Sequence, residues 1–200
     1  MEPITDISQL DVNKRYTYAD YLTWQFNERV ELIKGGLHKM SLAPRRLHQK
    51  IEGILHVKLW LFFENRTCEV YQSPFDVRLS KNKGQIEQKI NTVVQPDICV
   101  ICDKSKLDDA GCIGAPDLIV EILSDSTAKK DYNEKFNLYE ENEVKEYWIV
   151  NPATKTIEIF SLVENKYVSL GLFNEQEGAT TVEGHLFPEL SIELKTIFSE

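Results

Sequence analysis

An acidic residue stands in the middle of a strongly apolar segment of the chain. Glu121 lies within LIVEIL at residues 118–123, a run that predicts a strand buried on both faces. Burying an unpaired carboxylate there costs free energy, so its pKa rises and the protonated form is favoured. Glu121 therefore needs a partner, and a metal ion or a buried cation is the natural one. A salt bridge to a core arginine or lysine is the structural alternative.

Two further acids stand at the beginnings of expected strands. Asp97 and Asp117 each follow a proline, in QPDICVI and APDLIVE, where proline can stop strand pairing and mark an opening. Because side chains alternate along a strand, Asp117 and Glu121 share a face. If the two strands pair, Asp97 and Glu121 converge on an oxygen-rich site for a hard cation, Mg²⁺ or Mn²⁺. The alternative for Asp97 and Asp117 is a turn or strand-end carboxylate that accepts hydrogen bonds from local backbone amides.

The segments around these acids predict a mixed α/β domain whose central sheet is covered by helices. Apolar residues at helical spacing predict a long amphipathic helix from about Arg46 to Phe63. Thr17 and Asp20 stand at capping-box spacing before a short helix, and RVELIK and LHKMSL predict a hairpin around Gly35–Gly36. The other expected strands are CEVYQ, FDVRL, TVVQPDICVIC, APDLIVEILS, EYWIVN and TIEIFS, followed by weaker C-terminal strands and a short terminal helix.

A further helix, from about Tyr132 to Glu141, follows the strand of Glu121 after the polar loop SDSTAKKD. Asp131 is its expected N-cap, with Glu134 as the reciprocal residue of a capping box. Lys135 shares a face with apolar residues three and four positions later, which are expected to pack on the sheet. A lysine stem can run along apolar surface, so the Lys135 ammonium is expected to fold back toward the carboxylates.

The bulk composition is that of a globular protein. The chain has 200 residues, of which 42% are hydrophobic, so residues 1–200 are expected to form one domain. The N-terminus is polar, and no apolar run approaches the roughly 18 residues of a membrane helix, so no membrane partner is expected. The net charge of −9 argues against a constitutive, non-specific nucleic-acid binder, although carboxylates gathered around a metal also lower it. Basic residues occur in short clusters that each predict solvated surface: Arg45–Arg46 with Lys50, Lys81 with Lys83, and Lys129–Lys130.

The four cysteines, Cys68, Cys99, Cys102 and Cys112, are too few for a disulfide scaffold at this length. Cys99 and Cys102 form a C-x-x-C, but no second pair and no histidines at ligand spacing accompany them. We therefore expect two buried strand cysteines and a reducing, cytoplasmic location. A zinc or redox function for the pair is the weaker alternative.

QPDICVICD and the later GAPDLIVEILSDSTAKKDYNEKFNLYEENEVKEYWIVNP closely resemble the Uma-two family of restriction endonucleases, within the PD-(D/E)XK or restriction-endonuclease-like superfamily. The resemblance covers most of the chain, and RVELIKGGLHKMS with His48 matches the family's N-terminal block. It implies a restriction-endonuclease-like core with extra C-terminal strands. It also implies that Asp97 and Glu121 bind the metal and activate water. Glu31 and His48 match family positions that would line the site. Asp117 is expected beside them because it shares a strand face with Glu121, not because of the resemblance.

The sequence departs from the superfamily pattern at the lysine. Glu121 is followed by Ile122 and Leu123, so no lysine stands at the x-K position. The resemblance implies that Lys135 takes its place. His48, considered alone, is expected to be a surface or capping residue at the start of the long helix.

Two functions from different classes fit these observations. The first is a Mg²⁺-dependent endodeoxyribonuclease with Asp97, Glu121 and Lys135 as catalytic residues and DNA as substrate. The second is a catalytically degenerate nuclease fold that serves in binding or assembly, because a fold alone does not establish a function. The three intact residues favour the first, and the acidic net charge weakly favours the second. Cutting both strands of a duplex would favour a homodimer.

Overall fold

Two six-stranded sheets and one two-stranded sheet organise the chain in the computed structural model, which describes residues 3–40, 45–80, 87–124 and 130–199. In spatial order, the larger sheet consists of β12 (Lys166–Phe173), β11 (Thr156–Val163), β10 (Glu146–Asn151), β9 (Leu118–Ile122), β6 (Ile98–Ile101) and β3 (Glu69–Gln72). The second sheet consists of β2 (Gly36–Lys39), β1 (Val30–Ile33), β5 (Val93–Val94), β4 (Val77–Arg78), β8 (Gly111–Ile113) and β7 (Leu107–Asp108). β13 (Thr181–Glu183) pairs with β14 (Ser191–Glu193).

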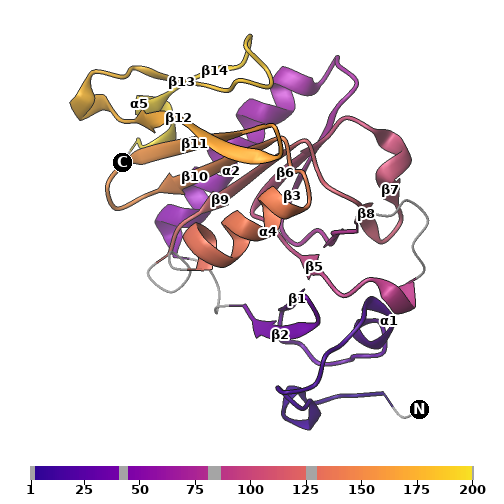
Figure 1. Ribbon diagram of the computed structural model, residues 1–200. Coiled ribbons are helices and arrows are strands. Elements are labelled where there is room, and N and C mark those ends of the chain that lie inside the picture. Colours follow the sequence, from indigo (N-terminus) through magenta and orange to yellow (C-terminus); the bar gives the residue numbers. More distant parts are fainter. Residues whose placement is uncertain (1–2, 41–44, 81–86, 125–129, 200) are drawn as a thin grey trace.

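Helices cover both faces of the larger sheet, and this confirms the predicted mixed α/β fold (Figure 1). On one face, α2 (Arg46–Phe63) packs its apolar stripe against β6 and β9, together with α5 (Leu194–Ile197). On the other face, α4 (Phe136–Glu141) buries Leu138 and Tyr139 against the alternate residues of the same strands. α2 spans the residues that its periodicity predicts. Among the described residues, no helix is long and apolar enough to cross a membrane.

The central position of β9 explains the apolar run around Glu121. All five residues of β9 are buried, because β9 lies between β10 and β6 and both faces of the sheet are covered. Ile98 pairs with Val120 in this register, so Asp97, one residue earlier, stands opposite Glu121. The predicted pairing of the two acid-bearing strands is therefore present.

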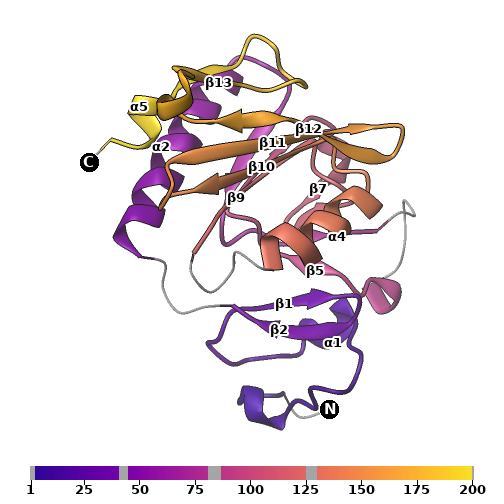
Figure 2. The ribbon, with the colours of Figure 1, turned by 60° about the vertical axis from the view of Figure 1, so that its left-hand side comes forward.

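The N-terminal part lies against one end of this body (Figure 2). α1 (Tyr18–Tyr21) has the predicted capping box of Thr17 and Asp20. β1 and β2 form the predicted hairpin, whose turn needs positive φ angles at Lys34 (50°) and Gly35 (81°). The short 3₁₀ helices are η1 (Ile7–Gln9), η2 (Glu87–Lys89), η3 (Lys104–Lys106) and η5 (Glu175–Glu177).

The prediction of one continuous strand is wrong. TVVQPDICVIC does not form a continuous strand; it supplies β5 to the second sheet and β6 to the larger one. Pro96 lies between them and cannot donate a hydrogen bond to a ladder, so the pairing stops there and resumes in the other sheet. Asp97 therefore stands at the junction of the two sheets. The hairpin of β7 and β8 was not predicted either.

A disulfide joins Cys68 to Cys102. β3 and β6 pair antiparallel with Glu69 opposite Ile101, so the two cysteines are the next cross-strand pair. This corrects the prediction that Cys102 is a buried free thiol, whereas Cys99 is one. Cys102 therefore no longer supports the expectation of a reducing location, which rested on free cysteines.

Breaking this disulfide is expected to lower the free energy of unfolding by about 2–4 kcal/mol, because it closes a loop between cysteines 34 residues apart. Urea unfolding with and without a reductant measures the difference. A Cys68→Ala, Cys102→Ala double variant should be insensitive to the reductant, and Cys99→Ala should keep the response of the wild type. Identical unfolding midpoints for the wild type under both conditions would contradict the prediction.

Candidate active site

The ammonium group of Lys135 lies inside the protein between three carboxylates. Its Nζ atom is 2.7 Å from Glu121 Oε1, 3.2 Å from Glu31 Oε1 and 3.8 Å from Asp131 Oδ1. All four residues are buried, with 5% exposure or less. Lys135 therefore reaches back from its helix to the β9 carboxylate, in the direction that the sequence predicts.

An irregular turn places Lys135 there. Residues Asp131–Lys135 form a π-helix, η4, that leads into α4. This corrects the prediction for Asp131: it lies inside the helical turn, and no side-chain hydrogen bond caps the helix at its start. The Tyr147 hydroxyl donates to the Asp131 carbonyl oxygen over 3.3 Å. Single π-turns within helices are rare and are frequent at functional sites, since they redirect side chains relative to a regular helix.

Glu31 joins the second sheet to this cluster. It projects from β1 and accepts a hydrogen bond of 3.1 Å from the backbone N–H of Gln95. Its carboxylate also binds the ammonium groups of Lys130 and Lys135. Burial alone would raise the pKa of Glu31, but Lys135 and Lys130 lower it to about 2. Lys130 is thus a partly buried ion-pair partner of Glu31 rather than the predicted solvated surface.

The other basic clusters are only partly described. Arg45 and Arg46 are exposed, as predicted. Lys81, Lys83 and Lys129 lie outside the described residues.

Glu121 has two hydrogen-bond donors of its own. Its Oε1 atom accepts from Lys135 Nζ and from the Tyr139 hydroxyl, each over 2.7 Å. Burial raises the pKa of Glu121 to about 8; Lys135 opposes this rise, and the carboxylates of Asp131 and Asp97 add to it. The buried cation that the sequence allows as a partner of Glu121 is therefore Lys135.

Asp97 connects this cluster to α2. Its Oδ2 atom accepts a hydrogen bond of 2.7 Å from the Ile122 amide of β9 and lies 3.3 Å from His48 Nε2. His48 is buried in the first turn of α2, so the prediction of a surface or capping residue is wrong. Burial alone would lower the pKa of His48, but the Asp97 carboxylate raises it above its usual value.

Glu52 is a site residue that the sequence interpretation missed. It follows His48 by one helical turn, and its Oε2 atom lies 3.7 Å from His48 Nδ1. Burial and the Asp97 carboxylate raise the pKa of Glu52 to about 7. The spacing of four residues from His48, on the buried stripe of α2, was the available signal.

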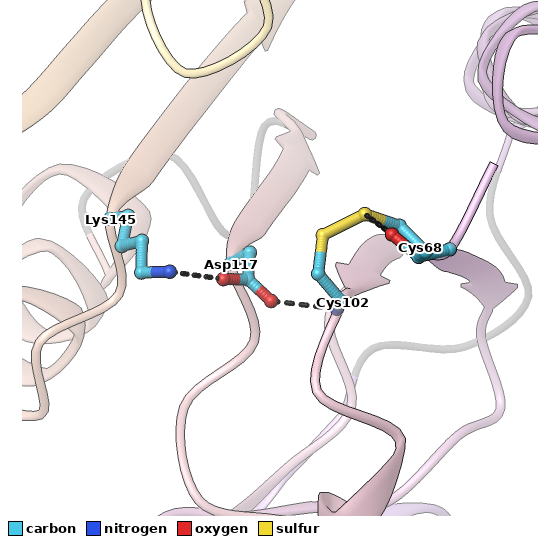
Figure 3. Close-up of a disulfide and its surroundings, with 5 residues drawn as sticks. Cys68, Cys102, Asp117 and Lys145 are labelled. Carbon is cyan, nitrogen blue, oxygen red and sulfur yellow. Dashed lines mark hydrogen bonds and ion pairs between the residues drawn. A yellow bond between two sulfur atoms is a disulfide. The ribbon is translucent and has the colours of Figure 1, made fainter.

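Asp117 does not belong to the cluster, contrary to the prediction that it lines the site. One of its oxygens accepts from Lys145 Nζ over 2.6 Å and the other from the Cys102 amide over 2.7 Å (Figure 3). It stands before β9, at the end of the strand remote from Glu121. Its role is to tie β9 to the neighbouring strands.

Carboxyl groups outnumber ammonium groups in the site, and their mutual repulsion contributes to the raised pKa values of Glu121 and Glu52. The described carboxylates are those of Glu31, Glu52, Asp97, Glu121 and Asp131, and the ammonium groups are those of Lys130 and Lys135. A divalent cation would offset this excess, and carboxylate oxygens are its preferred ligands. One ligand atom from each of His48, Glu52 and Asp97 already lies within 4.8 Å of the others. The residues present therefore fit a bound metal ion.

Comparison with known proteins assigns the family. The profile of Uma2, described as "Putative restriction endonuclease", matches residues 18–195. The chain belongs to the Uma2 family. This Uma2 chain is 26% identical over 148 residues to "Uncharacterized protein slr1290" of Synechocystis sp. (strain ATCC 27184 / PCC 6803 / Kazusa), an alignment covering 70% of this chain and 71% of that protein. It is also 26% identical over 158 residues to "Uncharacterized protein sll1609" of the same organism, which covers 76% and 84% of the two chains.

A solved structure shares the Uma2 fold. The crystal structure of a "putative nuclease belonging to DUF820" from Anabaena variabilis ATCC 29413 superposes with a TM-score of 0.70 at 17% identity. The superposition covers 92% of this chain and 98% of that one. The nuclease-like fold implied by the sequence resemblance is therefore confirmed.

Proposed function

We propose that this chain is a metal-dependent endonuclease that hydrolyses phosphodiester bonds in DNA. The observation that carries the proposal is the buried Lys135 ammonium, held against Glu121 and Glu31 beside Asp97 at the junction of two sheets. Membership of a family described as "Putative restriction endonuclease" supports a nuclease. An acidic cluster with a fixed ammonium group suits phosphoryl chemistry, in which positioning and charge stabilisation supply most of the catalysis.

Asp97 and Glu121 would hold the metal, because Asp97, just before β6, stands opposite Glu121 of β9 and both supply carboxylate oxygens. A bound divalent metal polarises the scissile phosphate and lowers the pKa of a water molecule. Lys135 would offset the negative charge that develops on the phosphate oxygens. Glu31, together with Lys130, would keep the Lys135 ammonium in position. We further propose a homodimer, since two copies related by a two-fold axis could cut both strands of a duplex.

A cleavage assay tests the proposal. Supercoiled plasmid, single-stranded DNA and RNA of matched length are each incubated with purified protein in Mg²⁺, Mn²⁺ or EDTA. We expect nicked or linear DNA with the metals, no product in EDTA and no product from Asp97→Asn. Wild-type cleavage by Asp97→Asn would overturn the proposed site. Folded wild-type protein that cuts none of the substrates would favour the degenerate module that acts in binding or assembly.

Mg²⁺ is expected to raise the melting temperature of the wild type and to raise that of Asp97→Asn and Glu121→Gln much less. A ligand that binds only the native state stabilises it by about 2.7 kcal/mol at a hundred times its Kd. Scanning fluorimetry in Mg²⁺ against EDTA measures the shift. Asp109→Asn, at an exposed position, should keep the full shift. Equal shifts in all four proteins would place the ion elsewhere.

A further inference from the structure

His48 holds a buried ring nitrogen without a hydrogen-bond partner. The residue is only 9% exposed, and its Nδ1 atom has no partner among the described residues. A buried polar atom without a hydrogen-bond partner destabilises the fold, so each such atom needs an explanation. The other nitrogen, Nε2, faces Asp97 Oδ2 at 3.3 Å.

Glu52 lies next to this nitrogen but does not satisfy it. The distance of 3.7 Å between Glu52 Oε2 and His48 Nδ1 is too long for a hydrogen bond. Glu52 itself has a side chain that is only 15% exposed. Two carboxylates and an imidazole therefore converge from α2 and the start of β6 without completing their hydrogen bonds to one another.

We propose that His48, Glu52 and Asp97 form a second divalent-cation position, on the α2 side of Asp97, which takes a transition metal such as Mn²⁺, Co²⁺ or Zn²⁺ in preference to Mg²⁺. One ligand atom from each residue lies within 4.8 Å of the others. Donors that bind one ion at about 2.1 Å stand about 3–4 Å apart, so small side-chain adjustments complete the set. The position extends the proposed function through the shared Asp97, but its occupancy is measured without cleavage.

The ligand atoms at this position determine which metal ion it prefers. Imidazole nitrogen binds Zn²⁺, Co²⁺ and related ions more strongly than it binds Mg²⁺, which prefers oxygen ligands alone. The position between Asp97 and Glu121 offers only oxygen, and Glu121 Oε1 already accepts from Lys135 and Tyr139. The two sides of Asp97 therefore differ in the ion that they favour.

The competing arrangement is a protonated His48 that bridges the two carboxylates without a metal. Its Nε2–H would then point to Asp97 and its Nδ1–H to Glu52. The Nδ1–H would remain 3.7 Å from its acceptor in a buried position, so this arrangement leaves the same atom unsatisfied. A cation coordinated at Nδ1 would remove this deficit, and direct measurement of metal binding separates the two arrangements.

Mn²⁺ binding is measured by the loss of the free-ion signal in electron paramagnetic resonance and, for the ligand type, by ¹⁴N coupling in pulsed experiments. We expect His48→Gln and Glu52→Gln to raise the Kd for Mn²⁺ by about tenfold or more, since even outer partners of a site are worth 10–100-fold. The ¹⁴N coupling should be present in the wild type and absent in His48→Gln. Glu121→Gln should keep the ¹⁴N coupling, and Zn²⁺ should displace the ¹⁴N-coupled Mn²⁺ more readily than Mg²⁺ does.

His56→Gln on the same helix and Glu64→Gln at its C-cap are matched controls and should bind like the wild type. Circular dichroism and melting in EDTA verify that every variant is folded. Wild-type Mn²⁺ affinity in Glu52→Gln and His48→Gln, or a wild type without ¹⁴N coupling, would overturn the proposal. Binding lost only in Glu121→Gln would do the same. A protein with this binding that cuts no DNA would overturn the proposed function and leave the cation position standing.

Discussion

Lys135→Met is expected to slow phosphodiester cleavage by about a hundredfold or more, the scale of losing one donor that stabilises transition-state charge. Methionine keeps the apolar stem and removes only the ammonium, which lies 2.7 Å from Glu121 Oε1. Lys135→Arg should restore only part of the rate, because a planar guanidinium does not replace a compact ammonium. Single-turnover cleavage of plasmid in Mg²⁺ measures these rates.

The same substitution should also destabilise the protein in EDTA. It leaves Glu121 and Glu31 without their shared cation, and removing one member of a buried ion pair costs about 3–5 kcal/mol. Lys145→Met is the matched control, since Lys145 also binds a buried carboxylate next to β9 but lies away from the site. Lys135→Met that is folded and cuts at the wild-type rate would remove Lys135 from the mechanism and leave Lys130 as the next candidate.

Glu31→Gln is expected to lower the free energy of unfolding at neutral pH by about 3 kcal/mol, the equivalent of a pKa held near 2 in the fold against 4.5 in the unfolded chain. The amide cannot neutralise Lys130 and Lys135, which both bind this carboxylate. Because the folded pKa is lowered, the stabilisation by Glu31 is complete above about pH 4.5 and is lost as the pH falls toward 2.

Urea unfolding of both proteins between pH 7 and 3 tests this pH dependence. The difference in unfolding free energy between wild type and Glu31→Gln should shrink steadily as the solution becomes more acidic. Glu189→Gln is the control, because its pair with Arg66 is exposed and worth under about 1 kcal/mol. A difference that is small at pH 7, or that does not change with pH, would show that Glu31 does not anchor the lysines.

Local periodicity made much of the fold predictable. α2 and the hairpin of β1 and β2 follow from spacing within a few residues, and the buried strand around Glu121 follows from its composition. The division of TVVQPDICVIC between two sheets was not predictable in this way, because the segment has the composition of one strand. Only the pairing partners, which lie far away in the chain, show that Pro96 separates two sheets.

The site was predictable where residue chemistry made an exception visible. Glu121 was predicted as a site residue because it is the one charged residue in LIVEIL. Lys135 was predicted to turn toward the sheet because it shares a helix face with apolar residues. The partner of Lys130 could not be found, since Glu31 is 99 residues away. Asp131 stands at a spacing that suits a capping box, and nothing local indicates that a π-turn draws it inward instead. Cys68 and Cys102 become neighbours only through the pairing of β3 with β6.

The long separation between Glu31 and Lys130 also sets when the site can exist. The β1 hairpin leaves a ribosome well before Lys130 and Lys135 have been synthesised, and contacts between such distant residues form only once the intervening chain has folded. Glu31 therefore has neither Lys130 nor Lys135 as a partner while the middle of the chain is being synthesised. The proposed site therefore cannot be complete until residue 135 of the 200 has been synthesised.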